Sequence, residues 1–188
     1  GSTGPAMQGV TLKINNPDPV TGEGEIWARG ENVMKGYYRE PAMTAEVLTP
    51  DGWFRTGDLG AVDKHGYLSI RGRLKNMIVG SSGENIYPEE IESVINDFGH
   101  VIESLVVQKK GKLVAMVHLN IEELQAKYAQ MKKDFTDQAE LIINEYLEEL
   151  QRYVNSRVNR YSQLQLVVYQ PEPFQKTATL KIKRFLYY

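Results

Sequence analysis

Cysteine is absent from the 188-residue chain, and histidine occurs only three times. Without cysteine there can be no disulfide bridge, no thiolate nucleophile and no cysteine-ligated zinc. His65, His100 and His118 are scattered along the chain, which disfavours a metal site built from imidazoles. We therefore expect no metal-binding residues in this chain.

Long apolar runs and a strong net charge are also lacking. No stretch approaches the ~18 to 20 consecutive apolar residues that a membrane-spanning helix needs, and residues 1–9 do not have the pattern of a signal peptide. With 22 basic and 24 acidic residues the net charge is −2, without the basic field typical of nucleic-acid binders. We expect a cytoplasmic globular protein without a transmembrane segment or a nucleic-acid partner. The basic residues of 176–184 leave peripheral membrane contact as an alternative.

The first part of the chain has the pattern of strands joined by turns. Residues 10–15 alternate between apolar and polar side chains, and residues 25–28 resume as a strand after two turn sequences. Asp63 to Gly66 is typical of a hairpin loop, because glycine adopts the positive φ that such loops require. The pattern predicts a β-rich piece.

The second part alternates between helices and strands. Pro88 predicts a helix start, since a first-turn N–H has no intrahelical partner, and the helix is expected to stop at Gly99. Strands are predicted over 101–108 and 113–119 and from residue 163 to 170. Helical spacing dominates 121–160, where Asp137 and Glu140 have the spacing of a capping pair.

Four short segments point to chemistry through their order more than through any one of them. Each alone has an ordinary structural explanation, as a turn, a helix start or an exposed tail. They are residues 52–58 (GWFRTGD), 72–76 (GRLKN), 83–92 (GENIYPEEIE) and 176–182 (KTATLKI).

With these segments, the chain resembles the adenylate-forming superfamily of acyl-CoA synthetases, firefly-type luciferases and peptide-synthetase adenylation domains. The resemblance extends from about residue 9 to residue 184 and is strongest to the long-chain fatty-acid CoA ligases. It implies an α+β fold in two parts. Residues 1–74 would be the β-rich end of a large AMP-binding N-terminal domain, and residues 75–188 a small mobile C-terminal domain with the helical block 121–160.

The resemblance also implies an acid–thiol ligase that uses ATP, a fatty acid and coenzyme A. Asp58 matches the carboxylate that binds the ribose of the nucleotide, which suits an acceptor-only group facing two hydroxyls. Arg73 matches an arginine of the same ribose region, which is the role we expect for it, with a surface or structural ion pair as the alternative. Lys75 matches the hinge between the domains.

Lys181 matches the lysine that supports adenylation by neutralising charge near the α-phosphate. Leu180 stands where the family usually has glycine, and leucine tolerates positive φ poorly. Gly83 would line the passage for the pantetheine arm of coenzyme A, with a plain turn glycine as the alternative.

The family also needs a Ser/Thr/Gly-rich phosphate loop and a Thr-Glu pair that helps hold Mg²⁺, and neither precedes Gly9. We therefore expect a C-terminal fragment that is inactive by itself, with the Mg²⁺ ligands in the missing part. Two alternatives remain at this point. One is an adenylating enzyme for an aryl or amino acid, and the other is a non-catalytic module that binds a nucleotide or a carrier protein.

Overall fold

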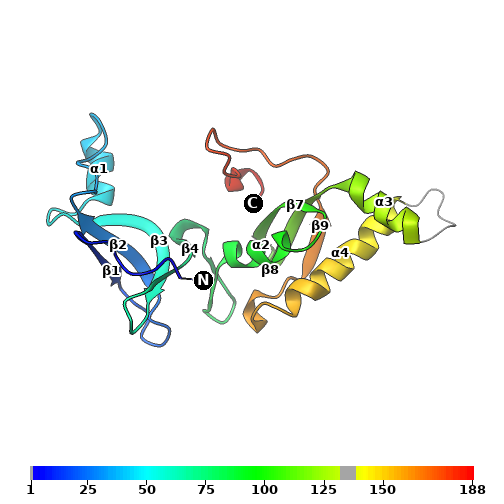
Figure 1. Ribbon diagram of the computed structural model, residues 1–188, viewed down its shortest axis with the longest axis horizontal. Coiled ribbons are helices and arrows are strands. Elements are labelled where there is room, and N and C mark those ends of the chain that lie inside the picture. The colour runs from blue at the N-terminus through cyan, green and yellow to red at the C-terminus, as the bar shows by residue number, and fades with distance from the viewer. Residues whose placement is uncertain (1, 132–138) are drawn as a thin grey trace. The chain divides into compact units, whose positions relative to one another are not determined.

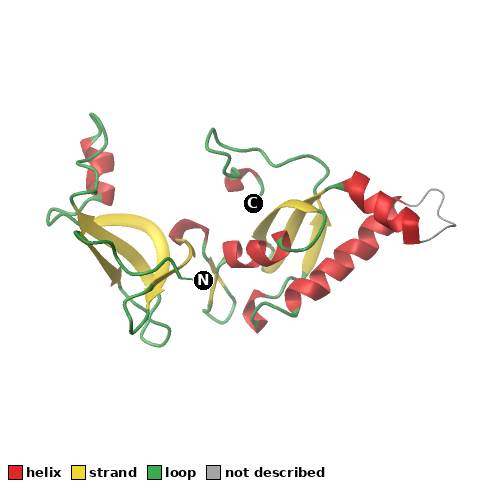
Figure 2. Cartoon of the chain, viewed as in Figure 1, coloured by secondary structure: helices red, strands yellow, loops and turns green. Residues whose placement is uncertain are grey.

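The computed structural model describes residues 2–131 and 139–188. It divides into two compact units, Gly1–Met77 and Ile78–Tyr188, which are treated separately below (Figure 1). Both units contain strands and helices (Figure 2), and the predicted α+β class is confirmed. In the described ranges, no helix is both long and apolar enough to cross a membrane.

The first unit is built on a four-stranded antiparallel sheet in which each strand pairs with the next along the chain. A short helix precedes the third strand. The elements are β1 (Val10–Asn15), β2 (Gly24–Gly30), α1 (Pro41–Val47), β3 (Phe54–Val62) and β4 (Leu68–Arg73). The predicted strand over 10–15 is confirmed. The predicted hairpin loop is also present, because an oxygen of Asp63 accepts hydrogen bonds from the backbone N–H groups of His65 and Tyr67.

The second unit centres on a three-stranded sheet in which β7 pairs antiparallel with β8, and β9 adds parallel to β8. A two-stranded ribbon precedes the sheet. The elements are β5 (Ile78–Val79), β6 (Asn85–Ile86), α2 (Pro88–Asn96), β7 (Val101–Lys109), β8 (Lys112–Leu119), α3 (Ile121–Met131), α4 (Ala139–Asn155) and β9 (Leu166–Tyr169).

Alternating residues of this sheet face two separate apolar clusters. Val106 and Ala115 belong to the larger core, together with residues of α2 and α4. Leu105, Val107 and Val114 face the other side and pack against Phe174 of the C-terminal segment. Because strand side chains alternate between the two faces, one sheet is covered by helices on one face and by the C-terminal segment on the other.

Helix α2 begins as predicted but ends earlier. Pro88 occupies the first turn, and the helix ends at Asn96, two residues before Phe98, so the predicted stop at Gly99 is wrong. Beyond the helix, the ring of Phe98 packs against the rings of Tyr146 and Tyr153 of α4, with centroids 5.3 and 4.7 Å away. Such aromatic contacts add Phe98 to the core that α2 and α4 share.

The predicted helical block 121–160 is divided between α3 and α4. Tyr146, Leu150 and Val154 are fully buried, as the helical spacing predicted. Asp137, half of the predicted capping pair, lies outside the described residues. The hairpin between β7 and β8 is tighter than expected, because Lys109 and Lys112 pair and only Lys110 and Gly111, both with positive φ, remain in the turn.

Candidate functional site

The Thr-Gly-Asp sequence forms an irregularity in β3. Between the pairs Glu25↔Leu59 and Trp27↔Arg55, β3 contributes two more residues than β2, so the strand bulges at this point. The hydroxyl of Thr56 donates to the carbonyl of Ile26 at 2.7 Å and accepts from the backbone N–H of Asp58 at 3.1 Å. A bulge redirects the side chains of its strand, and this one presents Asp58 at the edge shared with β4.

Asp58 and Arg73 lie opposite each other on β3 and β4 and form an ion pair. Nη1 of Arg73 is 2.9 Å from Oδ1 of Asp58 and donates to the carbonyl of Thr56 at 3.0 Å. The Arg73 side chain is 42% exposed and the Asp58 side chain 34%, so the pair is open to solvent. The structure therefore brings together two of the predicted site residues. The carboxylate keeps further lone pairs with which it can accept hydrogen bonds from a ligand.

Lys75 lies at the end of the first unit, in a short 3₁₀ helix, Leu74–Asn76. Its side chain is exposed. The first compact unit ends two residues later, at Met77, and the second begins at Ile78. The hinge at Lys75 and the predicted division after residue 74 stay predictions.

Gly83 closes the turn between β5 and β6. Its φ is +87°, and its N–H donates to the carbonyl of Gly80 at 3.0 Å. A Cβ at this position would meet nothing within 4 Å, so glycine is needed for the backbone conformation and not because of a neighbouring atom. The pantetheine role of Gly83 stays a prediction.

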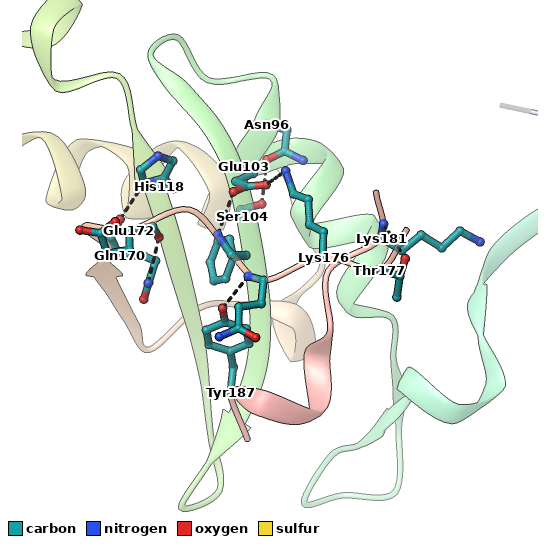
Figure 3. A network of polar contacts seen from close by, with 12 residues as sticks. Asn96, Glu103, Ser104, His118, Gln170, Glu172, Lys176, Thr177, Lys181 and Tyr187 are labelled. Carbon is teal, nitrogen blue, oxygen red and sulfur yellow. Dashed lines mark hydrogen bonds and ion pairs between the residues drawn. The ribbon is translucent and has the colours of Figure 1, made fainter. Parts of the chain in front are cut away.

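Lys181 follows a tight turn near the C-terminus. The backbone of Lys176 pairs with that of Ile182, and the N–H of Thr177 donates to the carbonyl of Lys181 at 2.8 Å. Three residues, 178–180, make the loop. Among the described residues the Lys181 ammonium has no ion-pair partner, and Figure 3 shows its side chain directed away from the polar network beside it.

Leu180 occupies the last position of this loop with φ +60° and a side chain that is 78% exposed. Three-residue hairpin loops commonly place a left-handed residue there, and glycine suits that position best. The chain thus adopts the left-handed turn in spite of its leucine. The hydroxyl of Thr177 helps to close the turn, because it accepts from the N–H of Lys181 at 3.2 Å and lies 3.0 Å from the hydroxyl of Thr179.

One end of the turn is held by Glu103 of β7, a residue that the sequence analysis did not single out. Its Oε2 lies 2.5 Å from Nζ of Lys176, and its Oε1 accepts from the N–H of Phe174 at 3.0 Å (Figure 3). The Glu103 side chain is only 12% exposed. The signal in the sequence was a Glu-Ser pair inside the otherwise apolar run 101–107.

The other end is held by Arg184, which forms a close ion pair with Glu92 of α2 and donates to the carbonyl of Val106 at 3.3 Å. Glu92 also accepts from the N–H of Val106 at 2.7 Å. Burial raises the pKa of Glu92 to about 7, although the charge of Arg184 and the hydrogen bond from Val106 act in the opposite direction. Both oxygens of Glu92 are therefore engaged in contacts that hold the structure, one with Arg184 and one with Val106.

The two histidines of the second unit also have structural contacts. Nδ1 of His100 lies 3.3 Å from Oε2 of Glu123, and Nδ1 of His118 lies 2.9 Å from the carbonyl of Gln170. No group of three or more metal-ligating side chains occurs within residues 2–131 and 139–188.

Comparison with known proteins relates this chain to CoA ligases, although no model of a protein family matches it. It is 33% identical over 186 residues to 2-methylpropanoate–CoA ligase CCL4 of Humulus lupulus, covering 94% of this chain and 31% of the relative. It is 50% identical over 94 residues to the long-chain-fatty-acid–CoA ligase heimdall of Drosophila melanogaster, covering 50% and 14%. Among solved structures, O-succinylbenzoate coenzyme A synthetase (MenE) of Bacillus subtilis, in complex with ATP and a magnesium ion, matches with a TM-score of 0.75 and 28% identity, covering 98% and 35%.

These similarities place the chain in the adenylate-forming superfamily, where it corresponds to a partial, C-terminal portion of the acyl- and aryl-CoA ligases. The chain spans about a third or less of the length of the relatives it matches. The predicted family membership is confirmed.

Proposed function

We propose that this chain is the C-terminal part of an ATP-dependent fatty-acid–CoA ligase that forms an acyl-adenylate and then an acyl-CoA. The observation that carries the proposal is the occurrence, in one chain, of the open Asp58–Arg73 pair and of Lys181 beside a tight, anchored turn. The 50% identity to a long-chain ligase over 94 residues supports a long-chain fatty acid as the substrate.

In the first half-reaction, an oxygen of the fatty-acid carboxylate attacks the α-phosphorus of ATP. The bond from that phosphorus to the bridging oxygen breaks, and pyrophosphate leaves with the electron pair. The reaction brings an anionic carboxylate toward an anionic phosphate, and Lys181 supplies a cation that offsets this repulsion. A preorganised group of this kind contributes about 3 kcal/mol to lowering a barrier.

Asp58 holds the nucleotide in this scheme. Arg73 already occupies Oδ1 of the carboxylate and fixes its orientation, and the remaining lone pairs accept hydrogen bonds from the two ribose hydroxyls. Each hydrogen bond to a charged group contributes about 1.5 to 3 kcal/mol. The residues that would hold the Mg²⁺ accompanying ATP are expected outside this chain, since the Thr-Glu pair that serves this purpose in the family does not precede Gly9.

In the second half-reaction, the sulfur of coenzyme A attacks the acyl carbonyl, the thiol proton passes to water, and AMP leaves with the electron pair of the anhydride bond. A rotation at Lys75 would exchange the turn that carries Lys181 for the turn that contains Gly83. An exposed 3₁₀ turn is a suitable place for such a change, since a hinge consists of a few residues that absorb a change in φ and ψ.

Pyrophosphate exchange with a panel of acids tests the activity. We expect exchange with long-chain fatty acids from the longer enzyme that contains this chain and none from the 188 residues alone. Robust exchange by the 188-residue chain would contradict the proposed division of the site. A preference for aryl or amino acids would keep adenylation and overturn the fatty-acid assignment, and no exchange with any acid would favour the non-catalytic module.

Two substitutions test the residue roles in the longer enzyme. Lys181→Ala should reduce adenylation about 100-fold, in line with the loss of one stabilising group, while supplied acyl-adenylate still reacts with coenzyme A. Lys183→Ala, two residues away, is the matched control and should change neither half-reaction. Asp58→Ala should raise the KM for ATP, with Asp51→Ala as control, and an unchanged KM would contradict the ribose role.

A further inference from the structure

The segment 174–184, which we call the Lys181 segment, is held at both ends by carboxylates of the second unit. Lys176 and Phe174 contact Glu103 before the turn, and Arg184 contacts Glu92 after it. Lys181, by contrast, is exposed. The contacts of the segment are therefore concentrated on either side of the lysine that the proposed function uses.

Both carboxylates are largely removed from water, with side chains that are 12% exposed. Burying a carboxylate costs free energy unless it is well paired, so a chain rarely places two of them beside one surface segment without a use for their contacts. Each carboxylate here has two partners. Glu103 uses one oxygen for Lys176 and the other for a backbone N–H, and Glu92 does the same with Arg184 and Val106.

Apolar packing also fixes the Lys181 segment to the sheet. Phe174 is 3% exposed and packs with Leu105, Val107 and Val114, and Ile182 and Tyr187 pack against the same cluster. The ring of Tyr187 meets that of Phe174 edge-on at 5.0 Å, and its hydroxyl accepts from the N–H of Gln175 at 2.9 Å. The base of the turn is thus fixed to the sheet, and only residues around 177–181 extend from it.

We propose that Glu103 and Glu92 are positioning residues that fix the Lys181 segment, and so the place of the Lys181 ammonium, without touching substrate themselves. The inference rests on the proposed function for the role of Lys181. Glu103 acts through Lys176 and the backbone at residue 174, and Glu92 acts through Arg184.

A displacement of about 1 Å at a reacting centre can reduce a rate about 100-fold. Loss of either contact should therefore lower the rate of adenylation and leave the KM for ATP almost unchanged, because the nucleotide is bound by Asp58. The second half-reaction should keep its rate, because it does not use Lys181.

Hydrogen exchange on the 188-residue chain tests whether the two carboxylates order the turn before Lys181, and this measurement does not require an active enzyme. The N–H groups of Thr177 and Leu180 close the turn, with acceptors in Lys181 and Thr177, so their exchange reports on its order. Glu103→Gln and Lys176→Met should each accelerate this exchange at least 10-fold while amides of the core strand β8 keep their protection. Glu148→Gln is the matched control, because it removes an exposed carboxylate whose ion-pair partner among the described residues is Arg152 of α4.

The catalytic half uses the same variants in the longer enzyme, together with Glu92→Gln. We expect each variant to lose about 10- to 100-fold in the kcat of adenylation. The Glu103→Gln Lys176→Met double variant should lose no more than either of its two single variants, because the two single variants and the double variant all remove the contact between Glu103 and Lys176. Lys176→Arg, which keeps the cation, should retain most of the adenylation rate that Lys176→Met loses.

Three outcomes would overturn the proposal. These are unchanged amide exchange in Glu103→Gln, equal loss of both half-reactions, and a comparable loss in Glu148→Gln. If the wild-type enzyme does not adenylate, the proposed function fails, whereas the exchange measurement still decides whether these carboxylates order the turn.

Discussion

Replacing Leu180 tests directly whether the turn before Lys181 is strained. Leu180 has φ +60°, a conformation that costs a residue with a side chain about 1 to 2 kcal/mol. Leu180→Gly removes that cost, and the greater freedom of glycine in the unfolded chain takes back about 0.5 to 1 kcal/mol. Because the side chain is 78% exposed, little packing is lost. The expected net result is a gain of about 0.5 to 1 kcal/mol in the free energy of unfolding of the second unit.

Leu180→Ala is the matched control, since alanine removes the exposed side chain and keeps the strain. Its free energy of unfolding should lie within about 0.5 kcal/mol of the wild type. Urea unfolding followed by circular dichroism at 222 nm reports mainly on α2, α3 and α4 of the second unit. Fluorescence reports on the first unit, because both tryptophans, Trp27 and Trp53, lie there and provide an internal reference. A glycine variant less stable than the alanine variant would refute the left-handed strain at Leu180.

Three further substitutions test other parts of the fold. Burial raises the pKa of Glu92 to about 7, above the ordinary value of 4.5, so the folded state binds the Glu92 proton more tightly than the unfolded state does. The free energy of unfolding of the second unit should therefore fall as the pH rises from 4.5 to 7. Glu92→Gln should flatten this dependence, which urea titrations across this pH range would measure. Ile95→Ala, at a fully buried position of α2, should cost about 2 to 5 kcal/mol and move the circular dichroism transition without moving the fluorescence transition. Lys13→Met should cost the first unit about 1 kcal/mol, measured by tryptophan fluorescence, because the Lys13 ammonium lies 4.5 and 4.3 Å from the ring centroids of Trp27 and Trp53.

Local signals in the sequence located most elements, because these signals act over a few residues. The alternation over 10–15 and the proline at the start of α2 correspond to the observed β1 and to the first turn of α2. The end of α2 was missed, and the contacts of Phe98 just beyond it are with Tyr146 and Tyr153, about 50 positions away, which no local pattern reveals. The pairing of β9 parallel to β8 was beyond local patterns for the same reason.

The candidate site shows the same division between local and distant information. The motif order singled out Asp58 and Arg73, but only the fold shows that they pair at 2.9 Å, because the bulge in β3 and the register with β4 decide which side chains meet. Glu103 was not singled out, since nothing near it in the sequence indicates a partner 73 residues further along. A charge in an apolar strand signals a contact but not its identity.

The leucine in the turn and the two carboxylates beside the Lys181 segment are connected by one physical requirement. A left-handed leucine persists only where the surrounding contacts leave the chain no better conformation. The paired backbones of Lys176 and Ile182 set the width of the turn, and three residues are too few to relax while both ends are held. A glycine at this position would adopt the left-handed conformation without such a constraint. In this chain the anchors must supply it, so the contacts of Glu103 and Glu92 stabilise the turn as well as locating it.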